Sequence, residues 1–311
     1  MHYRLCVTID VDPDGATFAG DGGWEWRSLD GLPGLRAILD DAGCPATWFL
    51  RTDDGVARAA GSYAFVYERW RGFWDEARAA GHELAVHPHF CGPASGGTGY
   101  VRLRDPALCC GQLRRVHGAL RAAGLEWPCI RVGEAFHCKE LMALIDELGY
   151  LVDSTAMPGR VRHDAERQFD WQGTPNAPYH PSRADHRLPG TPCFGVLEVP
   201  MTTMRFRADF DPAPMLRYAS LTYRPDIFAA GLRAHLAERP ATDGGHLVFI
   251  IHPAELDGRM ADATRRQLYA FDVDAVRRNL RAVVEAVGDR GATHAFCTLG
   301  ALARRPEAAP A

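Results

Sequence analysis

Short apolar segments alternate with helical patterns along almost the whole chain, and this alternation limits the fold more than any other feature of the sequence. Strands are expected at residues 3–10, 46–51, within 81–89, and at 130–133, 150–154, 196–201, 247–252 and 295–299. Helices are expected at residues 32–42, 63–80, 106–123, 139–148, 212–220, 225–238 and 271–287. Buried strands separated by helices form parallel sheets. We therefore expect an α/β fold whose sheet is either open or closed as a barrel.

The length of 311 residues is compatible with one large domain or two ordinary ones. No stretch of sequence resembles a linker, so we expect a single domain over residues 1–305. Residues 160–194 interrupt the alternation with polar, proline-rich sequence, and a loop of that length is usually functional or disordered. We interpret it as an insertion, and we expect residues 306–311 to form a mobile tail.

The composition is that of a globular protein with a sizeable core, because 47% of the residues are hydrophobic and 24% are charged. A formal net charge of -4 disfavours a nucleic-acid partner. The sequence contains no apolar run long enough to span a bilayer and no export signal, so a cytoplasmic protein is expected. The nine cysteines include no CxxC pair, which favours buried free thiols over disulfides or a zinc ribbon.

Titratable side chains stand at the ends of six of the expected strands. Because α/β enzymes carry their chemistry at the carboxyl ends of parallel strands, these side chains are expected to converge on one polar site. Each one alone also has a structural explanation, such as a turn, an ion pair or a cap. The residues are Asp10 and Asp12, His87 and His89, Arg131, Asp153, Glu198 and His252.

His87 and His89 are separated by one residue at the end of an apolar alternation. In a strand, residues i and i+2 point to the same face, so both imidazoles can approach one ion from the same wall. Such a pair is a candidate metal site. The structural alternative is a core histidine with one hydrogen bond, followed by a loop histidine beside Pro88.

Five segments resemble successive motifs of the polysaccharide deacetylases, the NodB-homology family, in order and approximate spacing. They are TIDVD at 8–12, GHELAVH at 81–87, RVG at 131–133, LGY at 148–150 and VFIIHP at 248–253. The resemblance covers roughly residues 3–300, although 160–194 has no family-wide counterpart. It implies a distorted (β/α)7-8 barrel that holds one divalent transition metal, commonly zinc, through one aspartate and two histidines.

The resemblance also implies roles for individual residues. Asp12 matches the metal-binding aspartate and His87 the first metal-binding histidine. Asp10 matches the general base, Arg131 the arginine that orients this base, and His252 the general acid. The spacer Val11 between the two aspartates departs from the common pattern of two adjacent aspartates, and we interpret it as a subfamily feature.

The second metal-binding histidine departs from the family pattern. The common pattern places it four residues after the first, and that position is Cys91 here. We assign the role to His89, which has the strand parity of His87. Cys91, or a water completing an Asp/His site, is the alternative.

These residues support a metal-dependent hydrolase. A metal with an open position activates water and polarises an amide carbonyl, while a positioned base and acid move the protons. We expect removal of an N-acyl group, most simply acetyl, from an amino sugar or a sugar-containing small molecule. One alternative is a metal-dependent amidase or deformylase acting on a non-sugar amide or cyclic ureide. The other is a non-catalytic carbohydrate-binding protein.

Substrate contacts are expected from the proline-rich insertion and from two strand ends. Trp171, Tyr179, His180 and Arg183 could cover the mouth of the site, and a purely structural role in the loop is the alternative. Asp153 and Glu198 are further candidates. The expected partner is a small-molecule or oligosaccharide substrate.

Overall fold

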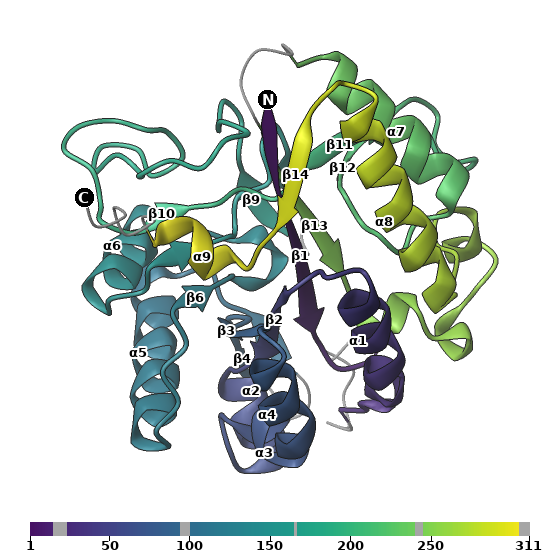
Figure 1. Ribbon diagram of the computed structural model, residues 1–311. Coiled ribbons are helices and arrows are strands. Elements are labelled where there is room, and N and C mark those ends of the chain that lie inside the picture. Colours follow the sequence, from purple (N-terminus) through teal and green to yellow (C-terminus); the bar gives the residue numbers. More distant parts are fainter. Residues whose placement is uncertain (15–23, 94–99, 165–166, 240–244, 305–311) are drawn as a thin grey trace, which may run out of the picture.

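In the computed structural model, a curled parallel sheet forms the centre of the molecule (Figure 1). The described residues are 1–14, 24–93, 100–164, 167–239 and 245–304. The expected mobile tail at 306–311 lies outside them. The strands run in the order β10 (Leu197–Glu198), β7 (Val152–Asp153), β6 (Cys129–Ile130), β3 (Glu83–His87), β2 (Ala46–Arg51), β1 (His2–Val11) and β13 (His246–Ile251), and β14 (Thr293–Phe296) also pairs with β1. All these pairs are parallel, which confirms the expected α/β fold.

Helices surround the outside of this sheet. α5 (Pro106–Ala122) and α6 (Lys139–Glu147) lie on one side of the molecule, and α1 (Leu32–Asp41), α7 (Pro225–Ala237) and α8 (Val273–Gly288) lie on the other (Figure 1). Between β10 and β13 no regular strand closes the barrel in the described chain. Irregular backbone covers that edge instead, since the Thr202 N–H donates to Val248 O at 3.1 Å and the Ile250 N–H to Ala219 O at 2.9 Å. The result is the expected distorted barrel.

Side-chain alternation divides the sheet into two apolar layers. Outward residues of β1, such as Leu5 and Val7, belong to the main core beneath the helices. Inward residues form a smaller core at the base of the barrel, and Leu299 of α9 (Leu299–Ala303) packs in this core. Its other members include Cys6, Phe49, Ala85, Cys129, Val152 and Val248. The same inward parity continues along each strand to its carboxyl end. Polar residues of this parity must therefore face the interior of the barrel.

The helix expected at 212–220 is wrong. Residues Met215–Tyr218 form strand β12, which pairs antiparallel with β11 (Thr203–Phe206). Asp211 fixes the turn, because its carboxylate accepts from the Ala208 N–H at 2.7 Å and from Arg217 at 2.6 Å. Too few residues lie between the prolines and Ser220 to propagate a helix, so pairing with β11 satisfies the backbone instead.

The helix expected at 63–80 is divided at Trp70 into α3 (Phe65–Arg69) and α4 (Arg71–Ala79). A further helix, α2 (Asp54–Ala60), precedes them, and the sequence analysis did not predict it. Its N-cap is Asp53, whose carboxylate accepts from the Val56 N–H at 3.0 Å.

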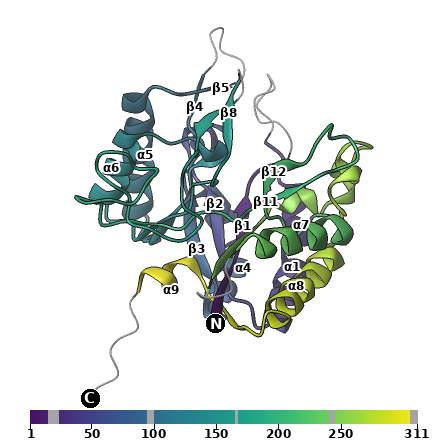
Figure 2. The same cartoon turned by 90° about the horizontal axis from the view of Figure 1, so that it is seen from above.

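Part of the insertion at 160–194 is a β-hairpin of β8 (Val161–His163) and β9 (Gln168–Asp170). A second short hairpin joins β4 (Cys91–Pro93) and β5 (Tyr100–Arg102). Both lie on the side of the molecule opposite to the N-terminus (Figure 2). Because β1 begins at the N-terminus, this is the side where the parallel strands end.

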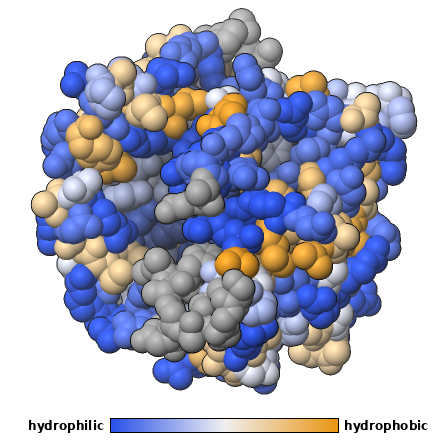
Figure 3. Space-filling model, turned by 180° about the vertical axis from the view of Figure 1, so that it is seen from behind, coloured by the Kyte–Doolittle hydropathy of each residue, from blue (hydrophilic) through white to orange (hydrophobic). Residues whose placement is uncertain are grey.

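The face shown in Figure 3 is mainly hydrophilic, with hydrophobic residues in small separate patches. Among the described residues, none of the helices has the length and apolarity needed to cross a membrane. All nine cysteines are free thiols, as expected, but only five of them are buried, and Cys193 is exposed.

Candidate active site and metal centre

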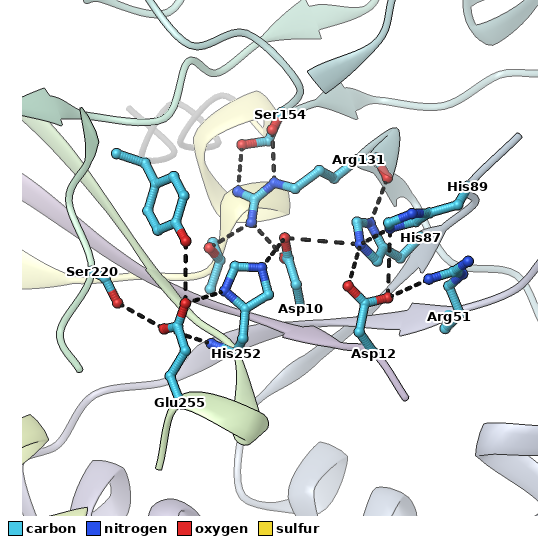
Figure 4. A network of polar contacts seen from close by, with 12 residues as sticks. Asp10, Asp12, Arg51, His87, His89, Arg131, Ser154, Ser220, His252 and Glu255 are labelled. Atoms are coloured by element: carbon cyan, nitrogen blue, oxygen red, sulfur yellow. Dashed lines mark hydrogen bonds and ion pairs between the residues drawn. The ribbon is translucent and has the colours of Figure 1, made fainter. Parts of the chain in front are cut away.

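A cavity of about 600 Å³ lies at the carboxyl ends of the strands. Its wall includes residues from four strand ends that the sequence analysis singled out: Asp10 and Asp12, His87 and His89, Arg131, and His252. Figure 4 shows these side chains pointing toward one another from separate strands. The predicted convergence therefore occurs for these six residues.

Asp12, His87 and His89 form the group of side chains that could hold a metal ion within the described chain. The Nε2 atoms of the two histidines are 3.1 Å apart, and each lies close to an Asp12 oxygen, at 3.7 Å for His87 and 3.5 Å for His89. One ligand atom from each residue lies within 4.8 Å of the others. Two imidazole nitrogens and one carboxylate, with space on the cavity side, suit a zinc-like cation with an open position.

The protonation of the three side chains also suits a cation. His87 Nδ1 lies 2.8 Å from the Arg131 carbonyl, so this nitrogen donates its proton and Nε2 keeps its lone pair for a metal. Burial and the nearby Arg51 lower the pKa of His89 well below its ordinary value, so this imidazole is neutral. Burial alone would raise the pKa of Asp12, but contact with the His89 and His87 imidazoles and the positive charge of Arg51 overcome it and hold that pKa well below its usual range.

Cys91, the alternative ligand, is not in this group. It is buried in β4, where its carbonyl accepts a hydrogen bond from Gln112. Burial and the neighbouring Asp53 raise the pKa of the Cys91 thiol to about 12. A thiol is a ligand only as the thiolate, so the geometry favours His89.

Asp10 lies beside the three candidate ligands but is not one of their group. Its Oδ1 accepts from Arg131 Nη1 at 2.7 Å. Its Oδ2 faces the cavity, 3.9 Å from His87 Nε2 and 3.8 Å from His252 Nε2. Arg131 is itself fixed by Thr8 Oγ1 at 2.8 Å and by the carbonyl and hydroxyl of Ser154 at 2.8 and 2.9 Å. One oxygen of Asp10 is thus anchored and the other is free to accept a proton.

His252 is held by Glu255, three residues later in the chain. Its Nδ1 lies 3.0 Å from Glu255 Oε1, and its Nε2 points toward Asp10 (Figure 4). Burial alone would lower the pKa of His252, but the Glu255 carboxylate, with Asp10 and Asp12, raises it to about 9. The imidazole is therefore a proton donor at neutral pH.

The sequence analysis missed Glu255. Its carboxylate accepts from Ser220 Oγ at 3.1 Å, Thr222 Oγ1 at 2.6 Å and the Tyr218 hydroxyl at 3.1 Å. Tyr218 ends β12, and Ser220 and Thr222 follow it, in and just beyond the segment 212–220 that was wrongly expected to be a helix. The spacing of three residues after His252 was the one available signal.

Arg51 at the end of β2 was also missed. Its Nη1 donates to Asp12 Oδ1 at 2.8 Å, and its Nε donates to Asp53. It is 2% exposed. Arg51 fixes the orientation of Asp12 toward the two histidines, and the available signal was its position at the carboxyl end of a strand.

Gly133 gives the His89 ring its space. A Cβ added at this position would lie 1.9 Å from His89 Cδ2. Gly133→Ala is therefore expected to displace the imidazole and weaken metal binding by roughly 10- to 100-fold, the range for groups that orient metal ligands. Metal titration of the apoprotein measures this.

Gly118→Ala is the matched control, since Gly118 lies within α5 and an added Cβ there has nothing within 4 Å. Equal metal affinity in both variants would contradict the role of Gly133.

The aromatic and basic residues expected to cover the site do not line this cavity. Trp171 is buried, and its Nε1 donates to Ala135 O at 3.0 Å. The Tyr179 hydroxyl donates to His186 O at 3.2 Å. Arg183 binds Cys193 O and Asp146, and His180 is exposed. The structure gives these residues contacts within the insertion and with the barrel edge.

Asp153 and Glu198 also lie outside the cavity lining; both are buried, and Asp153 has the parity opposite to that of the inward residue Val152. Asp153 Oδ2 pairs with His137 Nε2 at 2.8 Å. Glu198 Oε1 accepts from the Ala156 N–H at 2.9 Å. Burial and the nearby Asp153 raise the pKa of Glu198 well above its usual range. The predicted convergence does not include these two carboxyl groups.

No protein-family model and no curated protein matches the sequence. Among solved structures, a Mycobacterium smegmatis protein provisionally named a polysaccharide deacetylase matches over 98% of this chain and 95% of that chain, with 19% identity and a TM-score of 0.54. The catalytic domain of a peptidoglycan N-acetylglucosamine deacetylase from Eubacterium rectale matches over 95% and 89%, with 11% identity and a TM-score of 0.40. The first match shows that the chain has the fold of that protein, which confirms the fold that the motifs implied.

Proposed function

We propose that this protein is a metal-dependent hydrolase that removes an N-acyl group, acetyl in the simplest case, from an amino sugar. One observation carries the proposal. A candidate metal triad, an arginine-bound carboxylate and a carboxylate-bound imidazole face the same cavity. Asp10 Oδ2 and His252 Nε2 are 3.8 Å apart, so a proton acceptor and a proton donor flank one point beside the triad.

Asp12, His87 and His89 would hold the metal, which when bound supplies a Lewis acid that polarises the amide carbonyl and acidifies water. Asp10 accepts the proton of the attacking water through Oδ2. Arg131 pairs with this carboxylate and fixes its direction. His252 donates its proton to the leaving nitrogen, and Glu255 balances the positive charge of the imidazolium before that transfer.

The fold shared with the M. smegmatis protein supports the same assignment, because that protein is provisionally named a polysaccharide deacetylase. The test is a substrate screen on metal-loaded protein, with N-acetylated amino sugars beside simple amides, formamides and cyclic ureides. Release of acetate and a free amine from the sugars, abolished by a chelator, supports the proposal. Hydrolysis of only the non-sugar compounds would move the assignment to an amidase, and no hydrolysis with any divalent metal would contradict it.

Glu255→Gln is expected to shift the pH dependence of hydrolysis. The pKa of His252 is raised to about 9, so His252 is protonated below that pH and loses its proton as the pH rises through it. Removing the neighbouring carboxylate charge lowers this pKa. The alkaline decline of kcat is therefore expected at a pH that is lower by roughly one to three units. The pH profile of kcat for both proteins measures the shift.

A bound cation lowers the pKa of His252 in both proteins, so the difference between the two profiles is the informative quantity. Asp257→Asn is the control, because Asp257 pairs with Arg259 and does not line the cavity. A uniform loss of rate with an unmoved alkaline limb would show that Glu255 is only structural.

A further inference from the structure

The wall of the cavity carries more guanidinium groups than carboxylates. Every carboxylate in the described lining is already in an ion pair, three of them within the catalytic groups above and the fourth, Glu134, with Arg102 at 2.5 Å. Arg160, Arg167 and Arg265 also line the cavity, and among the described residues none of their guanidinium groups forms an ion pair with a carboxylate, although the backbone N–H groups of Arg167 and Arg265 donate to Asp164 and Asp262. We refer to these three as the unpaired arginines.

Arg160 is held in place by apolar groups. Its Nη1 lies 3.2 Å from the Met157 sulfur, and its guanidinium lies over the Phe169 ring at 5.6 Å. Burial and the nearby Arg167 lower the pKa of Arg160. A guanidinium removed from water without a counter-charge is unfavourable, and an anion bound in the cavity would relieve that cost.

Arg265 is also held in place by its neighbours. Its Nη1 donates to Met260 O at 2.9 Å, and its guanidinium lies over the rings of Phe271 and Tyr269 at 5.2 and 5.8 Å. The Tyr269 hydroxyl is 3.3 Å from the Tyr218 hydroxyl. Tyr218 in turn binds Glu255, so Arg265 belongs to the His252 side of the cavity.

Arg160 lies on this side too. The Pro158 carbonyl accepts from Thr203 Oγ1 at 2.9 Å, and a Cβ on Gly159 would lie 3.1 Å from Leu216, so the chain leading to Arg160 packs on the hairpin β11–β12. The paired Arg102 and Glu134 instead neighbour Gly133 and the metal ligand His89. The unpaired charges are therefore on the side where the proposed general acid stands.

We propose that the unpaired arginines bind an anionic group, a phosphate or a carboxylate, on the amine-bearing part of the substrate. The inference rests on the proposed function, because His252 protonates the leaving nitrogen and the sugar that carries this nitrogen lies on the His252 side. The planar guanidinium matches both oxyanions with paired hydrogen bonds. The substrate class is then an acidic N-acyl amino sugar, either a sugar phosphate or a uronic acid.

The test compares three probes by calorimetry on metal-loaded protein at low salt: N-acetylglucosamine, N-acetylglucosamine 1-phosphate and N-acetylglucosaminuronic acid. At least one acidic sugar is expected to bind about tenfold or more tightly than the neutral one, the effect of one charge-assisted hydrogen bond. Arg160→Gln is expected to remove that advantage and leave the affinity for the neutral sugar unchanged. The preferred probe distinguishes a phosphate site from a carboxylate site.

Arg162→Gln is the matched control, because Arg162 lies two residues away, pairs with Asp164 and does not line the cavity. Thermal unfolding and metal content establish that both variants are folded. Equal affinity for all three probes, or equal losses in both variants, would overturn the inference. If neutral sugars are hydrolysed as fast as acidic ones, independently of Arg160, the proposed function stands and the anion site fails. If an acidic sugar binds in an Arg160-dependent way but no amide is hydrolysed, the proposed function is contradicted and the anion site stands.

Discussion

Replacing His87 with alanine is expected to remove the bound divalent metal and to lower the rate of amide hydrolysis by at least about 10³-fold. Its Nε2 is one of three ligand atoms that meet within 4.8 Å, and two remaining ligands bind a transition metal much more weakly. Metal polarisation is worth several kcal/mol in the transition state, and about 1.4 kcal/mol is tenfold in rate. Metal content per chain after dialysis and kcat/KM measure the two effects.

His117→Ala is the control for this variant, since His117 lies on α5 and its Nδ1 is 3.4 Å from the Tyr150 hydroxyl, outside the cavity lining. His87 is buried, so the alanine also leaves the Arg131 carbonyl without its donor. His89→Ala tests the same site without that loss, because His89 Nδ1 has no hydrogen-bond partner among the residues that the structure describes. A full equivalent of tightly bound metal in both site variants would refute the triad.

Strand parity made much of the candidate site predictable. Asp10 and Asp12 share the inward parity of β1, and His87 has the inward parity of β3. His89 follows two residues later, beyond the end of the strand, and its backbone N–H donates to Asp53. His89 therefore faces the same side as His87 although β3 has ended, because the carboxylate of Asp53, the N-cap of α2, fixes the backbone at His89. The strand pattern and the motif resemblance therefore agreed on the site.

The residues that tune these groups were not predictable, because their partners are distant in the sequence. Glu255 is oriented by the hydroxyl groups of Ser220, the last residue of the helix wrongly expected at 212–220, and of Thr222, which follows that segment. Arg51 is positioned by Asp53 at the cap of the helix that was missed. A local sequence pattern gives no information about such contacts between loops.

In the insertion, residues that were expected in the site lie outside it. Trp171 and Tyr179 lie in proline-rich sequence, so they were expected at the mouth of the site. The Tyr179 N–H and carbonyl instead pair with the backbone of Glu198 at 3.0 and 2.9 Å, and this bridge places the tyrosine against the barrel edge. Other residues near the start of the insertion, including Arg160 and Phe169, line the cavity. Composition alone could not separate the buried aromatic residues from those in the wall.

Asp10→Asn and Asp12→Asn are expected to differ although the two aspartates are separated by one residue. Asn at position 10 keeps a carbonyl oxygen for Arg131 but removes the proton acceptor. The expected result is unchanged metal content with kcat lowered by roughly 10²- to 10⁴-fold, the usual contribution of a general base. Asn at position 12 removes a charged ligand, so metal affinity falls together with activity. Metal titration and kcat of both variants separate the two roles.

The Asp10 variant is the sharper of the two, because Oδ2 of Asp10 faces both His87 and His252 at similar distances of 3.9 and 3.8 Å. If Asp10 were a fourth ligand, its amide would lower metal affinity as the Asp12 variant does. If it were only the counter-charge of the buried Arg131, the variant would be less stable to heat while the folded fraction kept its full kcat. Because the variant also removes the counter-charge of Arg131, some loss of thermal stability is expected in either case. Loss of kcat in the folded, fully metal-loaded fraction is the pattern that distinguishes a proton acceptor.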